Sequence, residues 1–360
     1  MNQEELHQTL QTLRERIDEI DRQMLQLLEQ RMAEVQHIGD LKKANNAIIY
    51  RPEREKQILD RLERLSQGVL KRSAIDAIFL EIFAISRNVE LPEKVAYLGP
   101  TGSFSHQAAE SRFGAMSEYI PLSTIKAVFE SVDTERVRFG VVPIENNQEG
   151  TVVETVNLLN ECEVHIVAEI PMPIHFALAS KEEALQSIQK IYSKGIAFRQ
   201  CRQFLGEYFP HAEQVNVNST SMAAQLAAQQ PATAALCSSI AAKIYDLPVL
   251  FENIEDNAHN ATRFLIISKE FVNNKSEQDK TTILTNLPDQ AGSLAVFLQE
   301  FDRFGINLNK IESHPIKNEA KFKYWFYIDF AGHFTDENVQ RIFNKYEGQI
   351  RCLGSYVKLC

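Results

Sequence analysis

Residues 95–109 read V-A-Y-L-G-P-T-G-S-F-S-H-Q-A-A. A short apolar run passes into a loop with two glycines and then into a stretch that favours helix, which predicts a strand, a tight turn and a helix. Further β-rich runs alternate with helical stretches downstream, at 139–144, 164–170, 214–217, 234–237 and 263–268. This alternation predicts an α/β segment with a largely parallel sheet, long enough for two lobes with a cleft between them.

The preceding 90 residues show a helical pattern, with apolar side chains spaced alternately by four and three. These positions are Leu6, Leu10, Leu13, Ile17, Ile20, Met24 and Leu27. They predict one face of a long helix. About 40 helical residues would be roughly 60 Å long, so this helix needs a partner along its length, and a second copy of the chain is the natural one. A second helix is predicted from Pro52 to about Gly68, and a third from about Ser73 to Glu90.

Beyond a polar stretch at 270–280, which is expected to be a linker, strand and helix candidates follow in the order β-α-β-β-α-β. This order is the ferredoxin-like arrangement. The chain is therefore predicted to be multidomain. The expected parts are an all-α helical domain at 1–91, a two-lobed α/β domain at 94–270, and an α+β ferredoxin-like domain at 280–360.

The composition predicts a cytoplasmic globular protein. The 360 residues carry a formal net charge of −10, which argues against nucleic acid as the main partner. Five scattered cysteines without a C-x-x-C pair fit reduced thiols better than a disulfide framework. The N-terminus does not resemble a signal peptide. Charged and proline residues interrupt the least polar long stretch, 164–180, so no membrane span is expected.

Basic residues lie on or near the apolar face of the first predicted helix. Arg31 follows Leu27 by four residues, and Lys42 shares its face. A guanidinium on a buried stripe is costly without an anionic partner. Each cation alone is most simply a surface residue that keeps its charge in water. The full set predicts a site for a small anion, and it comprises Arg14, Arg31, Lys42 and Arg54 with Ser86 and Glu90.

In order and spacing these residues resemble the helical chorismate mutase family, through L-R-E-R-I-D at 13–18, Arg31, Lys42, R-P-E-R-E at 51–55, Ser86 and Glu90. The resemblance implies that Arg14, Arg31 and Arg54 bind the carboxylates of chorismate and that Ser86 assists. It places Lys42 and Glu90 at the ether oxygen as the catalytic groups. It also implies an interlaced homodimer, in which Arg14 reaches into the other copy's site.

The rearrangement of chorismate needs no nucleophile. It needs a held reactive conformer and stabilisation of charge on the ether oxygen. Many relatives carry Gln where this chain has Glu90, and an ionised carboxylate cannot donate a hydrogen bond. We therefore expect mutase kcat to fall as pH rises.

Three further motifs lie at the ends of predicted strands: G-P-T-G-S-F-S at 99–105, P-I-E-N at 143–146 and T-R-F at 262–264. Ligands of α/β sheets bind at the carboxyl ends of strands, which is where P-I-E-N lies, whereas T-R-F opens its strand. Alone, each motif is explained by a tight turn or a charged strand start, and N-S-T-S at 218–221 by a helix cap. Together they resemble prephenate dehydratase. The resemblance implies that Thr262 acts at the leaving hydroxyl, that Glu145 and Asn146 support it, and that Ser219, Thr220 and Arg263 bind or position substrate.

The C-terminal segment resembles an ACT regulatory domain, through P-D-Q-A-G-S-L at 288–294 and E-S-H-P at 312–315. The resemblance implies phenylalanine as effector, bound between paired modules. Ser293 replaces the usual Ala and His314 the usual Arg, which bears on effector affinity. The implied effector residues are Gly292, Ser293, Leu294, Glu312, Ser313, His314 and Pro315. The alternative is a module that only dimerises.

The resulting hypothesis is a bifunctional enzyme of phenylalanine biosynthesis that makes prephenate from chorismate and phenylpyruvate from prephenate. No cofactor or metal is expected, because the nine histidines form no ligand cluster such as H-E-x-x-H. Three alternatives stay open: a two-lobed binding protein without catalysis, an N-terminal segment that serves only as a dimerisation arm, and a dehydratase that accepts arogenate.

Overall fold

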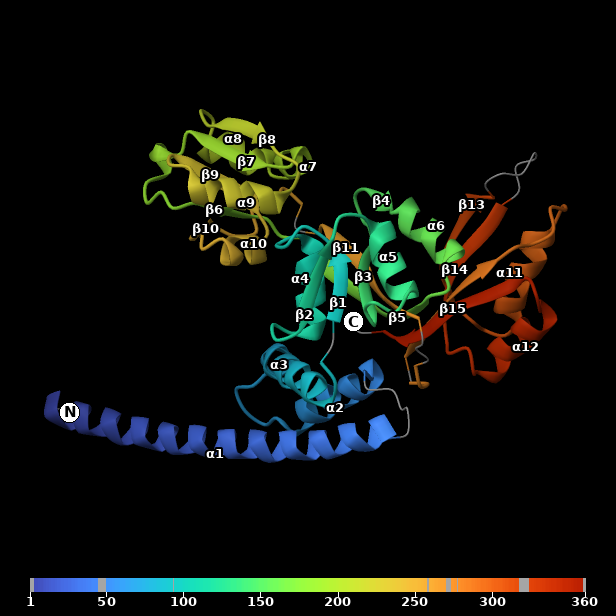
Figure 1. Cartoon of the computed structure of the whole chain (residues 1–360), viewed down its shortest axis with the longest axis horizontal. Coiled ribbons are helices and arrows are strands. Elements are labelled where there is room, and N and C mark those ends of the chain that lie inside the picture. The colour runs from blue at the N-terminus through green and yellow to red at the C-terminus, as the bar shows by residue number, and fades with distance from the viewer. Residues whose placement is uncertain are drawn as a thin grey trace.

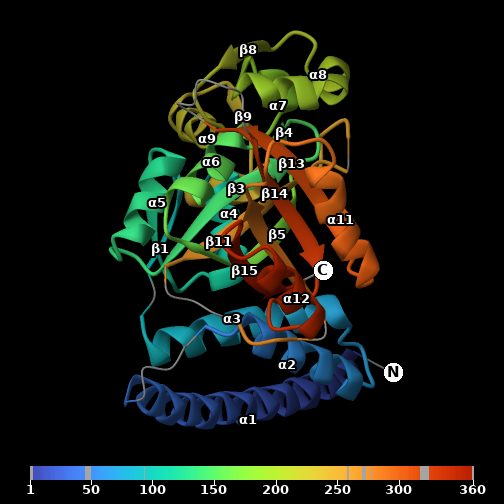
Figure 2. The same ribbon diagram turned by 90° about the vertical axis from the view of Figure 1, so that its right-hand side faces the viewer.

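The computed structural model describes residues 3–44, 50–92, 94–257, 259–269, 273–276, 278–316 and 324–358. A central α/β lobe contacts a helical layer, a second α/β lobe and a C-terminal module (Figures 1 and 2). The predicted fold class is confirmed: the helical layer is all-α, the middle of the chain is a two-lobed α/β unit, and the C-terminal module is α+β.

The helical layer consists of α1 (Gln3–Ala44), α2 (Pro52–Leu65) and α3 (Arg72–Glu90). Pro52 begins α2 at the first turn, where its missing N–H has no helical partner to lose. The C-terminal half of α1 packs on α3, and Gly39 allows this because a Cβ there would lie 3.1 Å from the Cα of Glu90. The N-terminal half of α1 extends beyond the rest of the molecule (Figure 1).

The apolar face of α1 is exposed along this projecting half. The exposed fractions of its seven predicted residues run from 43% at Leu6 to 64% at Leu27. A soluble helix normally buries such a stripe against a neighbour. The pattern that predicted this face was therefore correct, and one copy of the chain does not bury it.

The first lobe contains a sheet in the order β2 (Glu118–Leu122), β1 (Lys94–Leu98), β3 (Phe139–Asn146), β11 (Ala261–Ser268), β5 (His165–Pro173), with β4 (Gly150–Thr151) beside β3. Strand β1 is parallel to both its neighbours, whereas β11 is antiparallel to β3 and β5. The sheet is therefore mixed rather than largely parallel as predicted, because β11 returns from the second lobe and inserts antiparallel between β3 and β5. Helices α4 (Phe104–Phe113), α5 (Ile125–Asp133) and α6 (Val153–Glu161) complete the lobe.

The second lobe has a five-stranded sheet in the order β10 (Val249–Phe251), β6 (Ala177–Ala179), β9 (Thr233–Cys237), β7 (Lys190–Ser193), β8 (Glu213–Asn216). Its helices are η1 (Leu185–Ser187), α7 (Gly195–Gln200), α8 (Arg202–Tyr208), α9 (Thr220–Gln229) and α10 (Ser239–Ile244). The chain enters this lobe after β5 and returns through β11, so two connections join the lobes.

The C-terminal module follows the predicted β-α-β-β-α-β order: β12 (Asp279–Thr285), α11 (Ser293–Arg303), β13 (Leu308–Pro315), β14 (Tyr324–Ala331), α12 (Glu337–Lys345), β15 (Ile350–Val357). Its sheet shares one hydrophobic cluster with the first lobe, in which Tyr327 and Leu353 join Ile144 and Leu265. Gly354, at φ +150°, lets β15 approach the backbone of Ile166 closely. The module is therefore packed onto the first lobe.

Two contacts that the sequence did not predict join the helical layer and the C-terminal module to the first lobe. Tyr50 is fully buried with its ring centroid 5.5 Å from that of Phe113, and its hydroxyl accepts a hydrogen bond from Arg112 at 2.7 Å. Asn273, in the predicted linker, is buried and donates to the carbonyl oxygens of Val167 and Ser355. Residues 270–272 and 277 of that linker lie outside the described residues.

Candidate active sites

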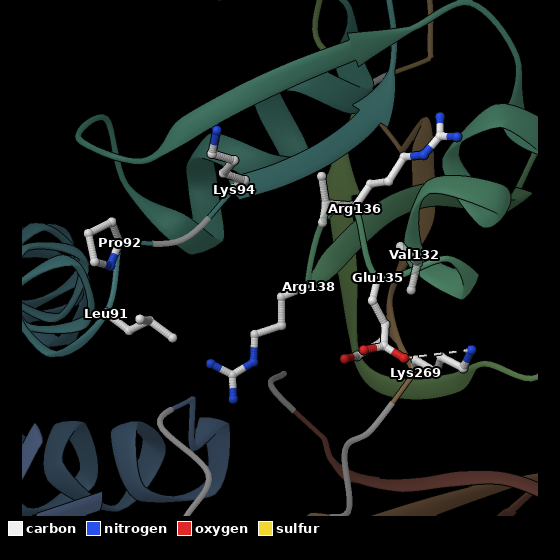
Figure 3. A pocket seen from close by; sticks show the side chains of 10 residues that line it. Leu91, Pro92, Lys94, Val132, Glu135, Arg136, Arg138 and Lys269 are labelled. Atoms are coloured by element: carbon white, nitrogen blue, oxygen red, sulfur yellow. Dashed lines mark ion pairs between the residues drawn. The ribbon is translucent and has the colours of Figure 1, made fainter. Parts of the chain in front are cut away.

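A cavity of about 390 Å³ lies where Leu91 and Pro92 join the helical layer to the first lobe. Figure 3 shows basic side chains around it, including Arg136 and Arg138, and Lys269 pairs there with Glu135 at 3.8 Å. Its described lining contains no residue predicted for either site. This cavity is therefore not a candidate active site.

A larger cavity, of about 610 Å³, lies within the helical layer. All three helices or the turns that precede them contribute to its lining. The cavity is lined by five of the residues predicted from the sequence: Arg31, Lys42, Arg54, Ser86 and Glu90. Residues 59 positions apart in the chain are thus brought to one cavity.

The polar groups of this cavity are held by short contacts between α1 and α3. Arg31 Nη1 donates to Ser86 Oγ at 2.5 Å, and Lys42 Nζ pairs with Glu90 Oε2 at 2.6 Å. Burial lowers the pKa of Arg31, while the negative charge of Glu90 acts in the opposite direction. A partly desolvated guanidinium fork beside an ammonium group suits recognition of a carboxylate.

Arg14 is the predicted residue that lies outside the cavity. It precedes Arg31 by 17 residues, which is about 25 Å of helix at ~1.5 Å per residue. Arg14 is exposed and does not belong to the described cavity lining. Arg14 of the same chain therefore cannot serve this cavity in the observed arrangement.

Three buried charged residues in the cavity lining were not singled out from the sequence: Glu53, Glu55 and Arg87. Burial raises the pKa of Glu53. Glu55 pairs with Arg87 and, at 2.9 Å, with Arg112 of the first lobe. The charged motif R-P-E-R-E at 51–55 contains two of these residues, but only the packing of α2 shows which of its charged side chains line the cavity.

The second candidate site lies between the two lobes. A cavity of about 280 Å³ is lined by Gln148 and Asn260 from the first lobe and by Arg199 and Gln200 from the second. Asn260 is only 2% exposed and donates to Gln200 Oε1 at 3.4 Å. This group of residues is called the interlobe cleft below.

Thr262 and Asn146 meet beside the interlobe cleft. The register of β3 and β11 places them opposite each other. Asn146 Nδ2 donates to Thr262 Oγ1 at 2.8 Å and to Asn260 Oδ1 at 3.0 Å. The predicted pairing of P-I-E-N with T-R-F thus brings a hydroxyl and an amide together next to Asn260.

The glycine-rich loop closes one side of the contact between the lobes. Gly102 has φ +84°, and a Cβ at this position would lie 2.9 Å from Ser221 Oγ and 3.2 Å from the Cα of Ala241. Ser238 Oγ donates to the Gly102 carbonyl at 2.7 Å. Ser219 caps α9, accepting from the Met222 N–H at 3.0 Å, so Ser219 and Thr220 begin the helix that meets this loop.

Glu145 and Arg263 lie on the other face of the sheet. Side chains alternate along a strand, so the neighbours of Asn146 and Thr262 point away from them. Arg263 pairs with Glu145 at 3.1 Å and with Asp329 of β14 at 2.8 Å. The predicted supporting and binding residues are thus divided between the two faces, and Glu145 and Arg263 face the C-terminal module.

The two predicted effector motifs lie at the same end of the C-terminal sheet. Phe326 of β14 pairs with Thr285 of β12 on one side and with Ser313 of β13 on the other. The segment 288–294 therefore follows one strand end, and 312–315 forms the other. Gly292 has φ +88° at the head of α11, which leaves backbone N–H groups exposed there. His314 stacks on Trp325, with ring centroids 4.8 Å apart.

Within the described ranges, no group of three or more His, Cys, Asp or Glu side chains could hold a metal ion. The described helices also include none that is long and apolar enough to cross a membrane. Cys162, Cys201, Cys237 and Cys352 are free thiols, and Cys360 lies outside the described residues.

The fold and the two candidate sites define a class of protein: a multidomain enzyme with a basic cavity in a helical layer, a two-lobed α/β unit and a ferredoxin-like C-terminal module. Residues 13–91 match the family of type II chorismate mutases, and residues 95–271 match prephenate dehydratase. The chain belongs to the family of bifunctional chorismate mutase/prephenate dehydratases.

Individual relatives agree with this assignment. The bifunctional chorismate mutase/prephenate dehydratase of Aquifex aeolicus is 38% identical over 97% of this chain and 98% of its own length. That of Pseudomonas aeruginosa is 36% identical, also over 97% and 98%. The solved prephenate dehydratase of Arthrobacter aurescens, in complex with L-Phe, is 32% identical with a TM-score of 0.67, over 74% of this chain and 90% of that one.

The chain is therefore an enzyme with chorismate mutase and prephenate dehydratase activities, acting in phenylalanine biosynthesis. This confirms the function expected from the sequence. It also decides against two of the alternatives, the binding protein without catalysis and the N-terminal segment that serves only as a dimerisation arm.

Proposed function

We propose that the two reactions occur at two separate sites, the helical cavity and the interlobe cleft. The observation that carries this proposal is the convergence of Arg31, Lys42, Arg54, Ser86 and Glu90 on one cavity, remote in sequence from Thr262. Incubating the pure protein with chorismate, and following prephenate and phenylpyruvate separately, tests whether both steps proceed. Supplying arogenate in place of prephenate tests the remaining alternative substrate.

In the helical cavity, Arg31 and Arg54 bind the two carboxylates of chorismate, and Ser86 holds the Arg31 side chain in place. Lys42 has three N–H donors, so it can keep its bond to Glu90 and still donate to the ether oxygen. These groups are fixed before the substrate arrives. They therefore stabilise the charge that develops as the C–O bond breaks without having to reorganise.

Glu90 is expected to make the mutase reaction pH-dependent. The groups that face its carboxyl include Lys42, at 2.6 Å, and the charge of Arg31. A carboxylate cannot donate a hydrogen bond to the ether oxygen whereas a carboxylic acid can, so wild-type kcat should fall with rising pH. Glu90→Gln keeps a donor at every pH and should flatten the profile.

The measurement is mutase kcat against pH for both proteins, with dehydratase activity as the control for folding. Identical profiles would show that Glu90 does not donate to the ether oxygen.

The oligomeric state follows from the exposed apolar face of α1 and from the position of Arg14. A second copy that packs on this face would bury it and would bring its own Arg14 towards the cavity that Arg31 lines. We infer a homodimer with interlaced sites, built on a self-complementary interface.

Mixing two inactive variants tests this arrangement. Arg14→Ala and Arg31→Ala chains should each lose mutase activity, because each lacks one carboxylate-binding group. After subunit exchange, one site of each heterodimer has both arginines, so about a quarter of wild-type mutase activity should return for random pairing. Intact-dimer mass spectrometry, with one variant isotopically labelled, monitors the exchange. No recovery from exchanged dimers would place both arginines in the site of the same chain.

In the interlobe cleft, Thr262 assists departure of the ring hydroxyl as CO₂ is lost and the ring becomes aromatic. Its Oγ1 accepts from Asn146, so its own proton is available for a different acceptor. Asn146 thus orients the hydroxyl, and Ser219 and Thr220 at the head of α9 bind the substrate's polar groups from the second lobe. Closure of the two lobes would leave the ring carboxylate poorly solvated, which favours its loss.

Phenylalanine is proposed as the effector, bound at the shared sheet end formed by 288–294 and 312–315. A relative of this chain was solved with L-Phe, and the first lobe shares a hydrophobic cluster with the module. Phenylalanine should therefore inhibit dehydration of supplied prephenate more strongly than the mutase reaction, with a coupling energy of ~1–3 kcal/mol.

Titrating phenylalanine into the two separate assays, with calorimetry on the full chain, measures both effects. An absence of binding and of inhibition would reject the effector assignment.

The free thiols support cytoplasmic placement, where cysteines stay reduced.

A further inference from the structure

Asn146 and Thr262, which lie beside the interlobe cleft, are carried on strands whose neighbouring side chains reach the C-terminal module. Thr262 pairs with Asn146 in register, and Arg263 pairs with Glu145 one position along. The first pair faces Asn260 and the second faces β13 and β14. Contacts that hold Glu145 and Arg263 in place therefore also fix the positions of the strand ends that carry Asn146 and Thr262.

Two side chains of the C-terminal module hold this second pair. Lys310 of β13 reaches Glu145 at 2.9 Å and Thr151 Oγ1 at 3.2 Å. Asp329 of β14 reaches Arg263 at 2.8 Å. The module thus supplies one positive and one negative partner, and each meets the opposite charge on a strand of the dehydratase.

Much of this ion-pair group is shielded from water. The side chain of Asp329 is 0% exposed and those of Lys310 and Arg263 are 13% and 17% exposed. Burial alone would raise the pKa of Asp329, but Lys280 and Arg263 hold it below its ordinary value. Removing Asp329 leaves the largely desolvated Arg263 without its most buried partner, and removing Lys310 leaves Glu145, 36% exposed, with Arg263 alone. The strand ends should respond to either loss.

The group also reaches a predicted effector residue. Lys310 pairs with Glu312 at 3.1 Å, and Glu312 in turn contacts Thr151 of the dehydratase and His314. Glu312 is the first residue of the E-S-H-P motif. A ligand that engages this motif would compete for Glu312 and alter the partners of Lys310.

We propose that Lys310 and Asp329 are positioning residues of the dehydratase. They act through Glu145 and Arg263 to hold Asn146 and Thr262 in the geometry of the interlobe cleft. Lys310 also carries the effector's influence, because it binds Glu145 and Glu312 at once. This second part rests on the proposed function, in which phenylalanine binds the E-S-H-P motif. In this proposal Glu145 and Arg263 influence the reaction from the opposite face of the sheet, without contacting the substrate.

The test uses the full-length chain with Lys310→Met, which keeps the length of the side chain and removes its charge. Dehydratase kcat should fall about ten- to a hundredfold with a smaller change in KM, because the reacting geometry is lost more than binding. The half-inhibitory concentration of phenylalanine should rise at least about fivefold. Lys310→Arg should recover most of both properties.

Matched controls separate positioning from simple loss of stability. Lys345→Met breaks a lysine–glutamate pair of the same module, with Glu300 at 2.6 Å, and should leave kcat and the phenylalanine response unchanged. Mutase activity reports folding of each variant. Glu145→Gln is a second variant of nearly identical shape. Its effect should not add to that of Lys310→Met, because both remove the same contact.

A Lys310→Met variant that behaves like Lys345→Met would overturn the proposal. So would a loss of both activities together with a lower Tm and no rescue by Lys310→Arg. Fully additive effects of Lys310→Met and Glu145→Gln would also overturn it. If wild-type protein is not inhibited by phenylalanine, the effector assignment fails instead, and the kcat measurements still decide the positioning role.

Discussion

Arg31→Ala is expected to lower mutase kcat/KM by about two to three orders of magnitude while leaving dehydration of supplied prephenate unchanged. Arg31 lies in the wall of the helical cavity and donates to Ser86 at 2.5 Å. Its removal takes away a preorganised guanidinium fork for one substrate carboxylate, and the neighbouring Arg54 cannot bind both carboxylates. The dehydratase residues lie on other elements, so their reaction should continue.

Two further variants sharpen this measurement. Arg31→Lys keeps the charge and loses the planar fork, so it should recover only part of the activity. Arg22→Ala removes an arginine of the same helix that pairs with Glu19 on the exposed surface, and it should leave both activities intact. If Arg31→Ala abolished both activities in a folded protein, the assignment of two separate sites would be wrong.

Thr262→Val should produce the opposite result, with dehydratase kcat lower by about two to three orders of magnitude and mutase activity unchanged. Valine has nearly the shape of threonine and keeps the strand, but it removes the hydroxyl that Asn146 orients at 2.8 Å. The leaving hydroxyl then loses its donor. Thr262→Ser restores that donor and should retain most of the activity.

Steady-state assays on supplied prephenate, with circular dichroism as the control for folding, measure this effect. A valine variant as active as wild type would remove Thr262 from the chemistry. A loss that appears only in KM would assign it to substrate binding instead.

Periodicity alone determined a large part of this protein. The spacing of Leu6 to Leu27 predicted the apolar face of α1, because a helix repeats every 3.6 residues wherever it lies. The same geometry put Arg31 and Lys42 on one face, and both line the cavity. Alternation of strands and helices predicted the α/β lobes and the ferredoxin-like module. The motif order added the identity of both reactions.

Strand alternation could also separate Glu145 from Asn146 and Thr262 from Arg263, but it could not say which of them faces the substrate. That depends on the register of β3 against β11 and on the module that covers one face. Likewise, the burial of Tyr50 and its bond to Arg112 join residues 62 positions apart.

Local pattern is set by neighbours along the chain, so the sequence predicted the elements and five of the residues that line the helical cavity, but none of those that line the interlobe cleft. The partners of buried charges are set by packing between distant segments. Only the tertiary structure therefore decided that Glu145 and Arg263 face Lys310 and Asp329.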